Sequence, residues 1–168
     1  LPTPNVTPLL TVFHQFSVSH RDVILNTTFL QEAQARGWFM LAPKGATDIN
    51  FSSLVSQANT EFVLRWVMEN YNIDRSRIYG VGFSMGGGNA LSYAARHLDP
   101  FGPMFAAVVN LNGSLSISDV YVNEIGTHWA LNFLYGGNPT EQPFAYSRSS
   151  VLEIDQATGF VIPERSMA

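Results

Sequence analysis

Four short apolar segments recur along the first two thirds of the chain, and a stretch with helical spacing separates each from the next. The apolar segments span residues 8–13, 38–42, 78–82 and 105–109, and the helical stretches span 22–36, 54–71 and 86–97. The apolar segments are continuous rather than alternating, which is typical of strands that are covered on both faces. This order predicts an α/β fold: a mostly parallel sheet with helices on both faces.

The third apolar segment runs into a glycine-rich stretch that contains a single serine. Gly82-Phe83-Ser84-Met85-Gly86 matches Gly-x-Ser-x-Gly, a nucleophile elbow in which a strand turns at once into a helix. Glycines at both ends remove side chains that would collide in so tight a turn, and the Ser84 hydroxyl then projects above the sheet edge. The Met85 N–H group, at the start of the helix, is placed to donate to an oxyanion.

Two other interpretations of this stretch are a phosphate-binding loop and a capping turn. A phosphate-binding loop is excluded, because no Gly-Lys-Ser/Thr follows and because Met85 stands where Gly-x-Gly-x-x-Gly needs its last glycine. A glycine-rich turn in which Ser84 only caps the helix stays open as the structural alternative.

The residues NIDRSRIY at 72–79 and GFSMGG at 82–87 resemble the α/β-hydrolase fold, and more narrowly its esterase branch of polyhydroxyalkanoate depolymerase-like and feruloyl esterase-like enzymes. Prolyl oligopeptidase-type peptidases share much of this segment. The resemblance covers roughly residues 9–112 and implies a three-layer αβα fold with Ser84 as nucleophile. It also implies a second oxyanion donor in the loop after the first strand: Phe16 N–H and Met85 N–H would both donate to the oxyanion. This chain has Gln15 where relatives usually have glycine, and His14 is expected to orient the loop rather than to catalyse.

A serine nucleophile needs a histidine base and an orienting carboxylate, which follow it in this fold in the order Ser, Asp or Glu, His. His97 falls at the end of the helix that starts at the elbow, about 17 Å away at 1.5 Å per residue, and is expected to serve as a helix C-terminal charge. Within the chain, His128 is the candidate base, and Asp119 or Glu124 lies ahead of it; Ser84, Asp119 and His128 follow the required order.

Relatives place the acid and the base after further strands, and no such strands can be identified in this sequence. We therefore expect the fold to lack its C-terminal strands here, with the sheet and the triad completed by a missing segment or a second chain. A compact variant that uses His128 is the alternative. In domain terms, residues 1–112 are expected to form the hydrolase core, and 113–168 a cap or excursion of the same domain with one short helix at 129–134.

Composition excludes several classes of protein. The chain has 168 residues, a formal net charge of −4 and no cysteine, so it has the length of one domain and no basic field for nucleic acid. No apolar run is long enough to span a bilayer. Histidines and carboxylates do not cluster at ligand spacing, so neither a metal nor another cofactor is expected. The compartment stays open, with a secreted or periplasmic location slightly favoured.

These observations predict a serine hydrolase that cleaves a small-molecule or polymeric carboxylic ester through an acyl-enzyme on Ser84. A serine peptidase of the prolyl oligopeptidase type is one alternative. A non-catalytic binding domain that keeps the hydrolase fold is the other.

Overall fold

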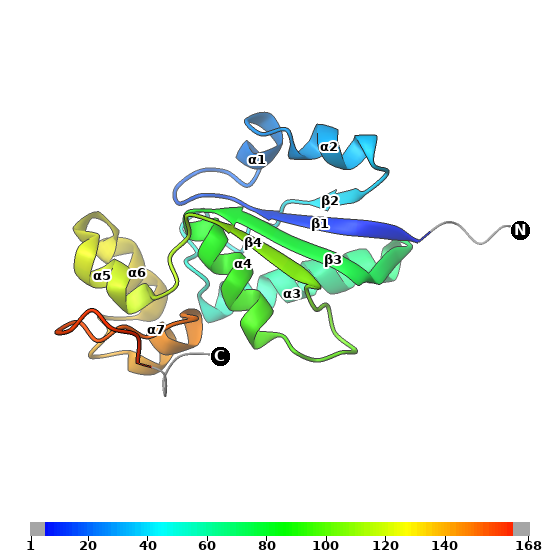
Figure 1. The fold of residues 1–168 in the computed structure, drawn as a ribbon. Helices are drawn as coiled ribbons and strands as arrows, with labels where there is room; N and C mark the ends of the chain where they lie inside the picture. Colours follow the sequence, from blue (N-terminus) through cyan, green and yellow to red (C-terminus); the bar gives the residue numbers. More distant parts are fainter. Residues whose placement is uncertain (1–5, 163–168) are drawn as a thin grey trace, which may run out of the picture.

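A parallel sheet of four strands forms the centre of the molecule. The structure, a computed structural model, describes residues 6–162. The strands lie in the order β2-β1-β3-β4, and every neighbouring pair is parallel (Figure 1). Their bounds are β1 (Thr7–Phe13), β2 (Phe39–Leu41), β3 (Ile73–Phe83) and β4 (Ala107–Leu111). The predicted parallel sheet is confirmed.

Helices cover both faces of this sheet, as predicted (Figure 1). One face carries α1 (Asp22–Leu25) and α2 (Phe29–Ala35), and the other carries α3 (Leu54–Asn70) and α4 (Met85–Arg96). Each face has its own apolar core. The first core is built around Val12, Val23 and Val81. The second contains Leu9, Leu64, Val67, Ile73, Ile78 and Tyr93.

Two elements differ most in extent from those that the spacing predicts. One helix is expected over 22–36, whereas the structure breaks it into α1 and α2. Thr27 lies in the break, where its hydroxyl donates to the Val23 carbonyl, a local bond of the kind that competes with helix continuation. Strand β3 begins at Ile73, five residues before the apolar run at 78–82. The apolar pattern does not indicate this first half, because it is polar and largely exposed.

The apolar stripe of α3 faces solvent rather than the core. Leu54, Phe62 and Trp66 are exposed, although their four-residue spacing predicts a buried face. The residues that the helix buries include Gln57, Thr60, Leu64 and Val67. Steps of four residues drift about 40° each around a helix, whereas alternating steps of three and four stay on one face. The second pattern is therefore the one that packs on the sheet.

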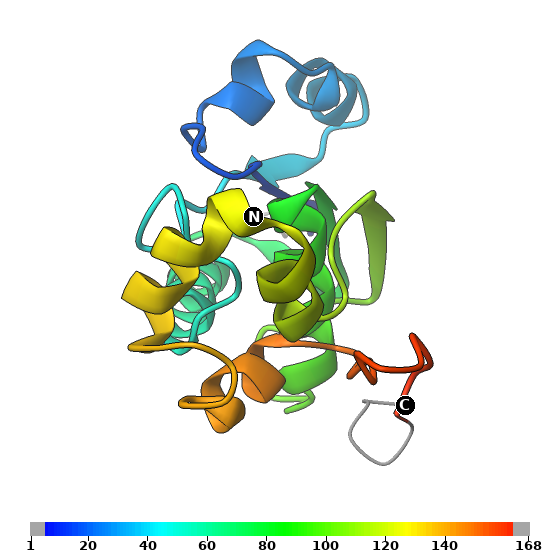
Figure 2. The ribbon, with the colours of Figure 1, turned by 90° about the vertical axis from the view of Figure 1, so that its left-hand side faces the viewer.

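The residues after β4 form a group of short helices at the carboxyl end of the strands (Figures 1 and 2). These are α5 (Ile117–Asn123), the 3₁₀ turn η1 (Ile125–Thr127), α6 (His128–Tyr135) and α7 (Pro143–Ser149). Their apolar side chains enclose Met85 and Phe51 in a third buried cluster, with Ile117, Val120, Leu131, Tyr135 and Tyr146. This group therefore covers the start of α4. Within residues 6–162, no helix is long and apolar enough to cross a membrane.

The start of α4 is pressed against main-chain atoms on more than one side. A Cβ atom at Gly82 would overlap the Gly86 carbonyl oxygen, and one at Gly86 would overlap the Phe13 carbonyl oxygen and lie 2.5 Å from that of His14. The end of β1 and the end of β3 thus both touch the first turn of α4. Only glycine allows this approach.

At the other end of α4, His97 is partly buried. Its ring stacks on Tyr93 with the ring centroids 3.8 Å apart, and its Nε2 lies 3.6 Å from the Glu61 carboxylate. Burial is the main cause that lowers the pKa of His97 below its ordinary value; the hydrogen bond to the Tyr93 carbonyl and the Glu61 charge act in the opposite direction. The fold therefore favours the neutral ring.

Replacing Gly86 with alanine is predicted to lower the free energy of unfolding by about 1–3 kcal/mol, because main-chain atoms of Phe13 and His14 must move. Gly126 is the matched control, since a Cβ there meets no atom within 4 Å. Gly126→Ala should leave stability unchanged or slightly raised. Urea denaturation of both variants measures the difference, and equal stability of the two would contradict the close approach.

His97 is predicted to make stability depend on pH. Because its pKa is lower in the folded than in the unfolded chain, the unfolded chain takes up a proton first, and stability falls as the pH drops below about 6.5. His97→Gln removes this contribution. The stability advantage of the wild type over His97→Gln, measured by urea denaturation, should therefore shrink from pH 7.5 to pH 5. An advantage that stays constant or grows towards acid pH would show that burial does not favour the neutral ring.

Candidate active site

Ser84 occupies the sharp turn between β3 and α4. Its backbone has φ 50° and ψ −123°, and a positive φ is uncommon for a residue with a side chain and is typical of functional turns. Ser84 is exposed, whereas residues 85–90 are all buried. The turn therefore lifts one side chain out of a densely packed region.

Hydrogen bonds fix the main chain of Ser84 on both sides. Its N–H donates to the Leu111 carbonyl at the end of β4, at 3.0 Å. Its carbonyl accepts from Gly87 and Gly88 in the first turn of α4, at 2.9 and 3.3 Å. The backbone is thus held by two neighbouring elements. Among residues 6–162 the side-chain oxygen has no hydrogen-bond partner, so it is available to a ligand.

Two further amide groups near this turn are unpaired within the described part of the chain. Met85 N–H, at the first position of α4, and Phe16 N–H, in the turn after β1, donate to no described residue. The Phe16 ring packs against the cluster that contains Met85. The close approach of Gly86 to the Phe13 and His14 carbonyls brings the same loop against α4. Both amides therefore belong to segments that meet at the start of α4.

The loop after β1 is anchored by a buried histidine. His14 is 1% exposed, and its two ring nitrogens lie 2.8 Å from the Gln15 carbonyl oxygen and 3.0 Å from that of Lys44. Gln15, the next residue in the loop, is exposed. The histidine is therefore committed to main-chain atoms of its own loop and of the loop after β2.

The structure does not join His128 or Asp119 to Ser84 by any hydrogen bond among residues 6–162. His128 donates from Nε2 to the Tyr121 carbonyl and stacks on the Tyr121 ring, with centroids 4.0 Å apart. Asp119 accepts from the Asn123 side chain at 2.8 Å. The two residues lie on α6 and α5 of the helical group, and each is bonded to a neighbour of its own. Both assignments stay predictions.

The sequence patterns did not indicate Asn50 and Asn89, two buried polar residues behind the candidate site. Asn89 lies on α4 one turn after Met85 and bonds to Asn50 in the loop after β2. The sequence carries one signal for the buried position of Asn89: it is a polar residue in the first turns of a helix whose neighbouring residues are small or apolar. Asn50 lies among residues that are typical of a surface loop, and its burial could not be read from them.

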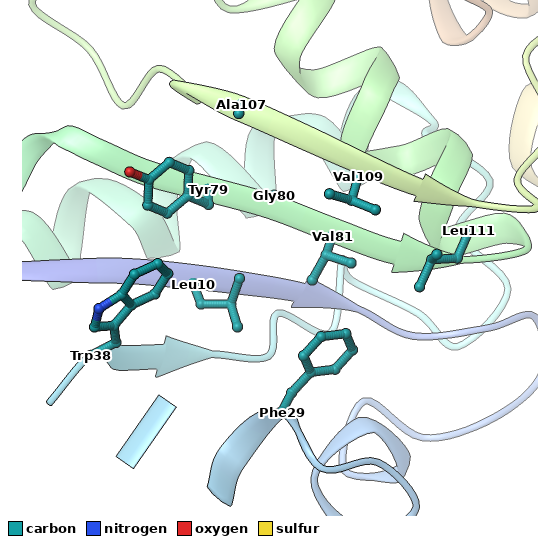
Figure 3. A pocket seen from close by; sticks show the side chains of 9 residues that line it. All are labelled: Leu10, Phe29, Trp38, Tyr79, Gly80, Val81, Ala107, Val109 and Leu111. Atoms are coloured by element: carbon teal, nitrogen blue, oxygen red, sulfur yellow. The ribbon is translucent and has the colours of Figure 1, made fainter. Parts of the chain in front are cut away.

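A wide apolar cavity of about 450 Å³ lies apart from Ser84, on the sheet face that α1 and α2 cover (Figure 3). Trp38 and Tyr79 stack at one end of it, with centroids 5.3 Å apart, and Leu111 lies at the other. Its remaining lining residues are Leu10, Phe29, Gly80, Val81, Ala107 and Val109.

No described group of three or more histidines and carboxylates is placed to hold a metal ion.

Comparisons with known proteins agree on the fold. No protein-family model matches the sequence, and no curated protein does. Similar solved structures are FphF, a fluorophosphonate-binding serine hydrolase of Staphylococcus aureus (17% identity, TM-score 0.59, 74% of this chain), an S-formylglutathione hydrolase of Agrobacterium tumefaciens (15%, 0.65, 88%) and a ferulic acid esterase (19%, 0.55, 91%).

This chain spans 50%, 58% and 61% of the length of those three chains. The parallel sheet with helices on both faces agrees with the likeness to these structures. The chain therefore has the α/β-hydrolase fold.

Proposed function

We propose that this protein is a serine hydrolase that cleaves carboxylic esters, with Ser84 as the nucleophile. One observation supports it above the others: the exposed side chain of Ser84 lies at a sharp turn with a positive φ, and β4 and α4 fix the main chain of that turn. Solved structures with the same fold include a serine hydrolase and a ferulic acid esterase. In the proposed reaction the Ser84 oxygen attacks the ester carbonyl carbon, the alcohol leaves, and water releases the acid from the acyl-enzyme.

The negative charge of the tetrahedral intermediate would be held by the Met85 and Phe16 amides. Both N–H groups are unpaired among the described residues, and Met85 lies at the positive end of the α4 dipole. Donors that are already in place stabilise the transition state without any rearrangement, and the loss of one such donor typically costs about 10²- to 10³-fold in rate.

The attack also requires a base to take the Ser84 proton. Within the chain the candidates are His128 as base and Asp119 as its acid, and the His128 ring would have to leave the Tyr121 carbonyl to serve. The expectation that a further segment or a second chain supplies the base and the acid also stays a prediction.

Ser84→Ala is predicted to abolish covalent labelling by a fluorophosphonate probe and to lower the hydrolysis of p-nitrophenyl esters more than about 1,000-fold. Intact-protein mass spectrometry and ester kinetics measure the two effects. Ser76→Ala is the control, because Ser76 is exposed and its hydroxyl bonds to nearby Asp74. If Ser84→Ala labels and hydrolyses as the wild type does, Ser84 is not the nucleophile.

The same assay separates the alternatives. If the His128→Ala variant is labelled at the wild-type rate, His128 is not part of the mechanism. If this variant loses labelling as completely as Ser84→Ala does, His128 is the base. Turnover of peptide substrates without turnover of esters would favour a peptidase. A wild type that neither labels nor hydrolyses any ester would favour a binding domain that keeps the hydrolase fold.

A further inference from the structure

A chain of buried polar side chains connects α4 to the two loops beside the candidate site. Asn50 and Asn89 are 1% and 5% exposed. The Asn89 amide donates to the Asn50 side-chain oxygen at 2.6 Å, and the Ser52 hydroxyl donates to the Asn89 oxygen at 2.7 Å. Burial in a medium of low dielectric makes such bonds costly to break, because each group left unpaired keeps its desolvation penalty.

Asn50 also bonds to main-chain atoms of its own loop, the loop after β2, and contacts His14 in the loop after β1. Its amide group donates to the carbonyls of Lys44 and Thr47 at 3.2 and 3.0 Å and lies 3.3 Å from His14 Nε2. The Lys44 carbonyl oxygen is therefore shared between Asn50 and His14. One side chain thus meets groups from three separate segments.

The loop that Asn50 stabilises has a strained main chain. Ala46, Phe51 and Ser52 have φ angles of 71°, 38° and 56°, and residues with side chains keep such conformations only where the surroundings enforce them. The Phe51 ring lies 5.1 Å from the Phe16 ring, between centroids. The Asp48 carbonyl of the same loop accepts from Ser17 N–H at 2.8 Å. The strained loop therefore contacts the segment of Phe16 through a ring and through the main chain.

We propose that Asn50 and Asn89 are positioning residues, which hold the Phe16 amide in register with the Met85 amide. Asn89 lies one helical turn after Met85, so the bond from Asn89 to Asn50 links the α4 end of the oxyanion hole to the loop that packs on Phe16. This inference rests on the proposed function, since it concerns the two amides of that site. Neither asparagine touches the substrate; each acts through Phe16.

Asn89→Ala is predicted to lower kcat for a p-nitrophenyl ester about 10- to 100-fold, with KM changed less than about twofold, because the amide is displaced while the rest of the site is kept. Tyr93→Phe is the matched control. It removes a buried hydrogen bond of the same helix, from the Tyr93 hydroxyl to the Pro103 carbonyl at 2.9 Å, one helical turn farther from Ser84 than Asn89. The control should keep kcat within about twofold. A kcat for Asn89→Ala no lower than that of Tyr93→Phe would overturn the proposal.

A second variant and a second readout keep the test valid if Asn89→Ala folds poorly. Ser52→Ala removes only the hydroxyl that donates to Asn89 and should lower kcat in the same direction by less. In ¹⁵N-labelled protein the Phe16 amide resonance should shift in Ser52→Ala and Asn89→Ala but not in Tyr93→Phe. An unmoved Phe16 resonance in both network variants would overturn the coupling.

These outcomes separate the two proposals. A wild type without ester hydrolysis or probe labelling overturns the proposed function, and the positioning role with it. A wild type that hydrolyses esters, together with variants whose Phe16 resonance shifts while kcat is unchanged, overturns the positioning role alone.

Discussion

The close contact between the first turn of α4 and the main chain of β1 and β3 is the constraint on which the rest of the structure depends. It leaves no room for a Cβ at Gly82 or Gly86, so a strand can run into a helix without a loop. The residue at the apex is then forced into a backbone conformation with positive φ and out of the core. Ser84 is that residue, and its exposure among buried neighbours is a direct consequence of the contact.

The layers of the fold could be predicted from the sequence because both signals are local. Continuous apolar runs indicate buried parallel strands, and glycines around one serine indicate a tight turn from strand to helix. The face that α3 buries did not follow from the apolar residues at four-residue spacing, because the helix is apolar on two sides and packs Leu64 and Val67, rather than Phe62 and Trp66, on the sheet. The sequence does not indicate helices α5 and α7 for a related reason: they are short and owe their stability to the cluster around Tyr146.

Some residues of the candidate site can likewise be predicted from local patterns in the sequence, and others depend on how the chain packs. Ser84 and the Met85 amide follow from a five-residue pattern, and the position of Phe16 followed from a resemblance to known relatives. The partners of His128 and Asp119 depend on how α5 packs beside α6, which no spacing in the sequence records. The bond between Asn50 and Asn89 joins residues 39 apart, and a lone asparagine in a loop is as typical of a solvated turn as of a buried support.

The account makes one central claim: the sharp turn at Ser84 presents a nucleophile to a site that the Met85 and Phe16 amides complete. A crystal structure of the protein after reaction with a fluorophosphonate tests it most directly. The account predicts phosphorus bonded to the Ser84 oxygen, with one phosphonyl oxygen about 2.7–3.1 Å from both amide nitrogens. An adduct on another residue, or a phosphonyl oxygen that faces solvent while both amides bond elsewhere, would contradict it.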